Sequence, residues 1–174
     1  IGLTRKSAQA ARIAGCGARM RENRFLELFA GGAGLSEAVA GLGLQAGVPQ
    51  DLFDRITGAR VSCFDLLDKE HFMQVRKLVR HGLITWLHGA PPCRTFSRAR
   101  RKDQHGTARV LCTDRYPQGI PPRSKEVLDA NLLAHRMAAL AYDQYCTGGW
   151  FTIENPEKSF IWSLRCMQRL AGLE

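Results

Sequence analysis

The stretch Phe25-Leu26-Glu27-Leu28-Phe29-Ala30-Gly31-Gly32-Ala33-Gly34 decides the fold, because an apolar run of strand length gives way at once to a glycine-rich turn. Glycines between a strand and a helix let the backbone approach a cofactor closely, with the amides of the helix end nearby. The spacing differs from the dinucleotide-binding Gly-x-Gly-x-x-Gly pattern, and no Gly-Lys-Ser/Thr follows to form a phosphate-binding loop. Such a turn also occurs without a ligand, so it does not establish a cofactor site by itself.

Outward from this turn, apolar runs of strand length alternate with amphipathic segments of helix length. Strands are predicted over 25–30, 59–64, 83–88 and 150–153, with a weaker one within 44–54, and helices over 36–41, 69–79, 124–145 and 161–170. Residues 98–123 have loop composition. The alternation predicts an α/β fold with a doubly wound, mostly parallel sheet and helices on both faces, and such sheets bind ligands at the carboxyl ends of their strands.

Acidic residues follow the second and third predicted strands. Asp54 and Asp65 stand there, and Asp51 competes with Asp54 for the first position. An acid after a second strand can accept hydrogen bonds from ribose hydroxyls, and one after a third can do the same for an adenine amino group. Most exposed aspartates do neither.

The fourth predicted strand leads into Pro91-Pro92-Cys93. Two prolines make a rigid turn, so we expect the cysteine to project from the sheet edge instead of packing in the core. Arg94, Arg98 and Arg100 would lower the pKa of its thiol and favour the nucleophilic thiolate. The alternative is the commoner one for a lone cysteine, a small buried hydrophobic side chain.

The fifth predicted strand leads into Glu154-Asn155-Pro156. Shielding by Trp150, Phe151 and Trp162 would raise the pKa of Glu154 and let it act as an acid. Alternatively, Asn before Pro begins a helix, with Asn155 as the cap. Both interpretations can hold together.

The formal charge of +9 is concentrated in two segments, 1–24 and 94–109. Their cations are Arg5, Lys6, Arg12, Arg19, Arg21, Arg24, Arg94, Arg98, Arg100, Arg101, Lys102 and Arg109. Focused positive charge suits a polyanion such as nucleic acid, although solvated basic loops have the same composition.

The six cysteines include no Cys-x-x-Cys pair, so the sequence suggests neither a metal site nor a secreted disulfide framework. No signal peptide or membrane-length apolar run is present in the sequence. We therefore expect an intracellular protein without a membrane partner, nuclear or cytoplasmic, and no metal. The first residue is Ile1, and the last helical pattern lacks a terminating proline, so we also expect a piece of a longer protein.

Three motifs together resemble the carbon-5 cytosine DNA methyltransferases. They are Phe-Ala-Gly-Gly-Ala-Gly at 29–34, Pro-Pro-Cys with Phe-Ser behind it at 91–97, and Glu-Asn-Pro at 154–156, and the resemblance covers residues 25–165. It implies an incomplete Rossmann-like, class I methyltransferase fold over 25–174. A basic leader over 1–24 would precede it, and the target-recognition region would be absent.

The resemblance also implies a cofactor, a substrate and roles for single residues. The cofactor would be S-adenosylmethionine, held by Phe29, Gly31, Gly32, Gly34, Leu35, Asp54, Asp65 and Pro91. Cys93 would attack carbon 6 of a cytosine flipped out of DNA, while Glu154 holds and protonates ring nitrogen 3. Contacts to the nucleic acid would come from Arg94, Ser97, Arg98, Arg100 and Asn155.

Two other functions are compatible with these residues. An RNA-directed relative would use the same cysteine chemistry, so RNA is a possible partner. A non-catalytic remnant of such an enzyme would bind nucleic acid through its basic segments, with strong salt dependence. The presence of both Cys93 and Glu154 favours an enzyme over a remnant.

Overall fold

A four-stranded parallel sheet lies at the centre of the protein in the computed structural model, which describes residues 24–51, 64–98 and 110–173. In chain order the elements are β1 (Arg24–Leu28), α1 (Gly34–Gly41), β2 (Gln45–Ala46), α2 (Lys69–Arg80), β3 (Trp86–Gly89), α3 (Lys125–Cys146), β4 (Trp150–Ile153), the 3-10 helix η3 (Phe160–Ser163) and α4 (Arg165–Ala171). The strand order is β2-β1-β3-β4, and every neighbouring pair is parallel. The predicted α/β alternation is confirmed.

The bounds of the observed strands match the predicted ranges to different degrees. β4 has the predicted bounds, whereas β3 begins three residues later than predicted, at Trp86. The weak second strand is reduced to the two residues of β2, and Gln50 adds an isolated bridge to Leu28. The strand predicted over 59–64 lies, except for Phe64, outside the described residues.

The continuous helix predicted over 161–170 is wrong. Leu164 adopts an extended backbone, with φ −70° and ψ 137°, which separates η3 from α4. The side chain of Leu164 is fully buried, and those of Ile161 and Met167 are buried with it. The chain therefore turns at Leu164 while all three side chains stay in the core, which periodicity along the sequence does not reveal.

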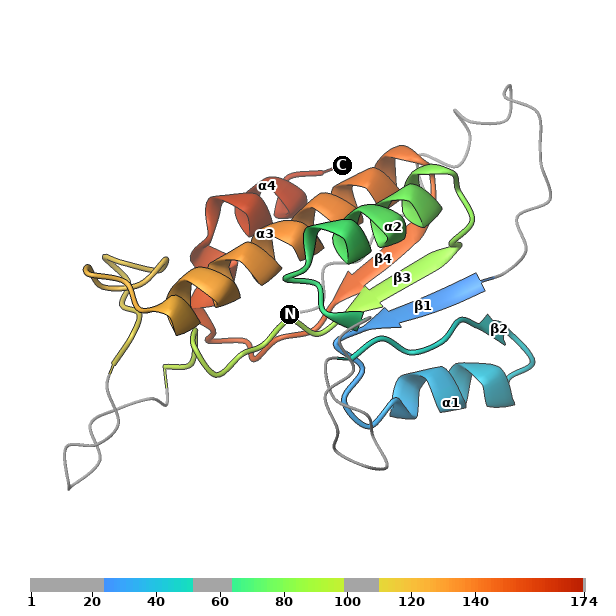
Figure 1. Ribbon diagram of the computed structural model, residues 1–174, viewed down its shortest axis with the longest axis horizontal. Helices are drawn as coiled ribbons and strands as arrows, with labels where there is room; N and C mark the ends of the chain where they lie inside the picture. Colours follow the sequence, from blue (N-terminus) through green and yellow to red (C-terminus); the bar gives the residue numbers. More distant parts are fainter. Residues whose placement is uncertain (1–23, 52–63, 99–109, 174) are drawn as a thin grey trace.

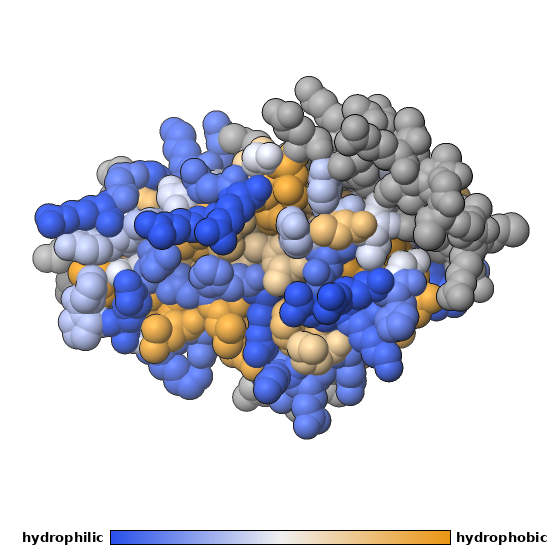
Figure 2. Space-filling model, turned by 90° about the horizontal axis from the view of Figure 1, so that it is seen from above, coloured by the Kyte–Doolittle hydropathy of each residue, from blue (hydrophilic) through white to orange (hydrophobic). Residues whose placement is uncertain are grey.

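The helices lie in different places around the sheet. Figure 1 shows α2, α3 and α4 gathered in one layer, with α3 between its neighbours, while α1 lies apart from them beside β2. Seen from above, the molecule is largely hydrophilic with hydrophobic patches (Figure 2), and α3 exposes Leu128, Leu132 and Tyr142. In the described part of the chain, every helix is too short or too polar to cross a membrane.

One side of the sheet forms the main core. Side chains alternate across a strand, and those on this side belong to Leu26, Leu28, Leu87, Phe151 and Ile153, all at most 4% exposed. They share a single cluster with buried residues of α2, α3 and α4. Gly89 continues this side of β3, where an added Cβ would lie 2.2 Å from the Met137 sulfur. A side chain at the end of β3 would thus overlap α3.

We expect Gly89→Ala to lower the free energy of unfolding by about 1–3 kcal/mol, because Met137 is fully buried and cannot move aside freely. Urea denaturation would measure the loss. Gly41→Ala is the matched control, since an added Cβ there meets no atom within 4 Å. Equal denaturation midpoints for the two variants would contradict the proposed overlap.

Candidate functional site

Three of the motifs predicted to form the site begin at the carboxyl edge of the sheet. Leu28, Gly89 and Ile153, the last residues of β1, β3 and β4, are register partners and lie side by side. Three turns therefore leave the sheet from neighbouring positions: the glycine turn (residues 29–34), the thiol loop (residues 91–98) and the acid loop (residues 154–159). The parallel pairing brings together motifs that lie far apart in the sequence.

The glycine turn has an unusual backbone. Phe29 and Ala33 have φ angles of 57° and 53°, in the left-handed region that residues other than glycine rarely adopt. Gly31 lies in the same region, at 52°. The Gly31 N–H donates to the Asp51 carboxylate at 2.8 Å, and the Ala30 N–H donates to the Gln50 carbonyl at 3.1 Å. Strained backbone of this kind clusters at binding sites, where surrounding contacts hold it.

Neither the backbone conformation nor the packing explains why two positions of this turn are glycine. Gly32 and Gly34 have no positive φ, and an added Cβ on either would meet no atom within 4 Å. Both are exposed, and Leu35 beyond them is half-buried. The backbone here is open to close approach by a ligand, which is what a cofactor lying across the turn requires. The residues present thus fit the cofactor implied by the sequence.

Two acids outside the glycine turn hold its backbone and the start of α1. Glu27 on β1 is 5% exposed, and its carboxylate accepts hydrogen bonds from the Ser36 N–H at 2.8 Å and the Ser36 hydroxyl at 2.6 Å. Sequence reasoning missed Glu27, although an acid inside an apolar strand was the signal. Asp51 holds Gly31, whereas its competitor Asp54 lies outside the described residues.

Asp65 lies at the turn that leads into α2. Its carboxylate accepts the Leu67 N–H at 2.8 Å, and its carbonyl accepts the Asp68 N–H. Asp68 in turn caps α2 by accepting the His71 N–H at 2.7 Å. Asp65 therefore shapes the entry to α2, and its contact with an adenine remains a prediction.

Cys93 is exposed, so the expectation that it projects from the sheet edge is confirmed. The Phe96 N–H donates to the Cys93 carbonyl at 3.0 Å, which closes a tight turn. Phe96 is fully buried and anchors the loop, and Pro91 is buried before it. Arg94 beside the thiol is exposed. The loop is thus fixed at both ends while its sulfur faces solvent.

Asn155 ties the thiol loop to the acid loop. It is 5% exposed, and its amide donates to the Pro91 carbonyl at 2.7 Å. Its own side-chain oxygen is buried without a hydrogen-bond partner among the described residues. No helix begins here, since η3 starts at Phe160 with Ser159 as its cap, so the predicted helix start is wrong. The buried amide holds the loop, and the contact of Asn155 with nucleic acid stays a prediction.

Glu154 is exposed, so the expected shielding by three aromatic residues is wrong. Trp150 lies at the amino end of β4, Phe151 points into the helix-covered core, and the indole of Trp162 donates to the Pro156 carbonyl at 2.9 Å. The Glu154 N–H donates to the Gly89 carbonyl at 3.0 Å, which keeps the acid at the edge beside the thiol loop.

A polar row crosses the side of the sheet away from α3. Glu27, His88 and Thr152 are register partners, and by alternation Glu154 follows Thr152 on the same side. The Thr152 hydroxyl lies 2.8 Å from His88 Nδ1 and accepts the Trp86 indole N–H at 3.1 Å. Burial lowers the pKa of His88, and the negative charges of Glu27 and Glu154 partly oppose this. No pattern in the sequence marked His88 as a candidate site residue.

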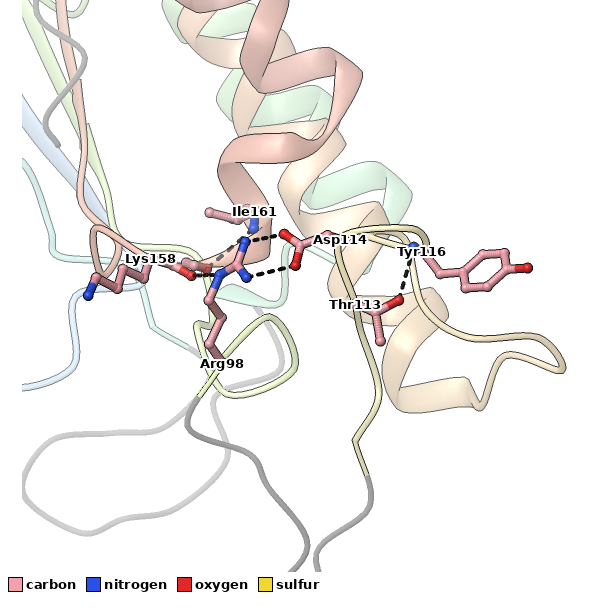
Figure 3. Close-up of polar contacts among 7 residues, drawn as sticks. Arg98, Thr113, Asp114, Tyr116, Lys158 and Ile161 are labelled. Carbon is pink, nitrogen blue, oxygen red and sulfur yellow. Dashed lines mark hydrogen bonds and ion pairs between the residues drawn. The ribbon is translucent and has the colours of Figure 1, made fainter.

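Arg98 bonds neighbouring loops of the protein (Figure 3), and its contact with nucleic acid stays a prediction. Its guanidinium bonds both carboxylate oxygens of Asp114, donates from Nε to the Lys158 carbonyl at 2.8 Å, and lies 4.2 Å from the centre of the Phe160 ring. The hydrogen bond with Asp114 raises the pKa of Arg98 and lowers that of Asp114. Arg100 lies outside the described residues, and Ser97 is half-buried.

Other features of the described chain lie away from this edge. An apolar hollow of about 510 Å³ opens at the amino ends of the strands, where Phe25, Trp86 and Trp150 line it, and it contains no predicted site residue. Among the described residues away from the edge, Cys146 and Cys166 are free thiols. Among the described residues, no three His, Cys, Asp or Glu side chains gather to hold a metal ion.

In comparisons with known proteins, no family model, no curated protein and no solved structure matches this chain. The functional argument therefore depends on the geometry of the carboxyl edge.

We expect Asn155→Ala to lower the free energy of unfolding by about 1 kcal/mol, because the Pro91 carbonyl loses its donor while an unpartnered buried oxygen is removed. Asn131→Ala is a matched control, since its amide donates to the Gln118 carbonyl at 2.8 Å and its oxygen is also buried without a partner. Urea denaturation should give similar losses for both, and a loss confined to Asn131→Ala would contradict the tie.

We expect His88→Gln to flatten the dependence of stability on pH. Because the folded-state pKa of His88 lies below its ordinary value of 6.5, its stabilising contribution is complete above that value. The contribution is lost as the pH falls from 6.5 through the lower folded-state pKa. Melting temperatures at pH 8.0 and pH 5.5 test this: the drop should be smaller in His88→Gln than in the wild type. Equal drops would contradict it.

Proposed function

We propose that this chain transfers a methyl group from S-adenosylmethionine to carbon 5 of cytosine in DNA, with Cys93 as nucleophile and Glu154 as its acidic partner. The single observation that carries the proposal is the exposed thiol of Cys93 in an anchored loop that Asn155 ties to the loop of Glu154. A thiol and a carboxyl held at one sheet edge are the pair that addition to a pyrimidine ring needs.

The topology supports a doubly wound, Rossmann-like methyltransferase fold. From β1 the chain runs through α1 to β2 on one side, and then returns to β3 and β4 on the other side of β1. With right-handed crossovers, this reversal puts α1 on the opposite face of the sheet from α3. The order reverses between β1 and β3, and such a point opens a crevice at the carboxyl ends where cofactors bind.

Eight residues are proposed to hold the cofactor. Phe29 and the glycines at 31, 32 and 34 would hold its two ends, with Leu35 and Pro91 at their sides. Asp54 and Asp65 are the proposed partners of the ribose and the adenine, and Asp51 supports the turn through Gly31. When bound, the cofactor supplies an electrophilic methyl group.

The proposed chemistry begins with the Cys93 thiolate, which forms a bond to carbon 6 of cytosine. The electron pair of the ring double bond moves toward nitrogen 3, where Glu154 donates a proton, and carbon 5 becomes nucleophilic. When carbon 5 takes the methyl group, the bond from that group to the cofactor would break and leave a neutral thioether. Carbon 5 would then lose its proton to water, Glu154 would take back the proton of nitrogen 3, and the bond from the Cys93 sulfur to carbon 6 would break as the ring double bond returns.

DNA is the proposed substrate because the exposed Arg94 adjoins the thiol and the net charge of +9 favours a polyanion. A pocket at a sheet edge reaches a cytosine only when the base is flipped out of the duplex. The same geometry accepts a cytosine of RNA, so an RNA oligonucleotide belongs among the test substrates.

The decisive experiment traps the adduct with an oligonucleotide that carries 5-fluorocytosine, in the presence of S-adenosylmethionine. Fluorine at carbon 5 prevents the loss of a proton, so the bond from sulfur should persist and shift the protein band on a denaturing gel. We expect an adduct with the wild type and with Cys146→Ala, whose exposed thiol lies on α3, and none with Cys93→Ala.

The controls separate the alternatives. An adduct with the RNA oligonucleotide alone would replace DNA by RNA as the substrate. Salt-dependent binding of DNA without any adduct would indicate the non-catalytic remnant and overturn the proposed activity.

A further inference from the structure

Three ties connect the thiol loop to the acid loop and η3. Before Cys93, the Pro91 carbonyl accepts the Asn155 amide at 2.7 Å. After Cys93, the Phe96 carbonyl accepts the Phe160 N–H at 2.9 Å. At the end of the loop, Arg98 Nε donates to the Lys158 carbonyl at 2.8 Å. Cys93 therefore lies in a segment that is bound on both sides to the loop that carries Glu154.

Arg98 joins several segments at this edge. Its planar guanidinium bonds the backbone of the acid loop and bonds Asp114 with both terminal nitrogens (Figure 3). It also lies over the Phe160 ring. A lysine has no fork of donors with which to make this set of bonds. Since Asp114 neutralises its charge, Arg98 is poorly suited to attract a phosphate.

We propose that Arg98 is a positioning residue, which fixes the thiol loop against the acid loop and so sets the place of Cys93 relative to Glu154. The proposal rests on the proposed function for its catalytic consequence, although the clamp itself is independent of that function. Displacing a reacting group by about 1 Å can lower a rate by about 100-fold, so loss of the clamp acts mainly on the rate of reaction.

The first test measures hydrogen exchange and needs no activity. In Arg98→Ala, the amides of Phe96 and Phe160 should exchange about tenfold faster than in the wild type, because both lie in the tied segment, while amides of α3 keep their rates. Arg80→Ala, at the end of α2, is the matched control and should change neither amide. Equal exchange at Phe96 and Phe160 in Arg98→Ala and the wild type would overturn the clamp.

The second test measures methyl transfer, with active sites counted by the 5-fluorocytosine adduct. We expect kcat per active site to fall about 10- to 100-fold in Arg98→Ala, with KM for DNA nearly unchanged, and Arg98→Lys should not restore it. A phosphate contact would instead raise KM for DNA and weaken its salt dependence, and that result would overturn the positioning role. An unchanged kcat per active site would also overturn it.

The two failures can be told apart. Absence of adduct and of methyl transfer in the wild type would overturn the proposed function, and hydrogen exchange would still decide whether Arg98 holds the two loops together.

Discussion

The parallel pairing of β1, β3 and β4 is the constraint on which the rest of the structure depends. Because Leu28, Gly89 and Ile153 are register partners, the three turns that follow them start at the same level. The pairing is held from the helix-covered side, where the apolar residues of all three strands are buried in one cluster. Gly89 shows how closely this side is packed, since α3 leaves no space for a Cβ there. A slip of one residue in the register would turn the apolar side chains toward the polar row and separate the three turns.

Beyond the sheet, contacts between loops decide which groups face solvent. Asn155 and Phe96 use buried atoms to hold the thiol loop, and Arg98 uses its charged group for the same purpose. Cys93 and Glu154 make none of these ties and are exposed. The division is physically reasonable, because a nucleophile and an acid must stay available to a substrate while their neighbours restrict their motion. The strained backbone at Phe29 and Ala33 belongs to the same edge, and the hydrogen bond from Gly31 to Asp51 supports it.

The helices and strands with clear periodicity were predictable, and so was the exposure of Cys93 after two prolines. The predictions that failed concern side chains whose partners are distant in sequence. The aromatic residues near Glu154 in the chain predict that it is shielded, but alternation along β4 and the turn after it direct them elsewhere. Arg98 belongs by sequence to a basic segment, and only the structure shows its contacts with Asp114 and Phe160. The helix over 161–170 failed because the burial of Leu164 outweighed its local helical pattern.

The sequence by itself determined the α/β alternation, the glycine-rich end of β1, and the presence of a thiol and a carboxyl after two later strands. These features are local, since strand and helix periods and the stiffness of proline act over a few residues. Only the tertiary structure decided that the turns share one edge, that Glu154 is exposed while Glu27 and Asn155 are buried, and that Arg98 bonds two loops. The reason is that register, burial and hydrogen bonding between loops depend on which distant segments pack together, and no local pattern specifies those partners.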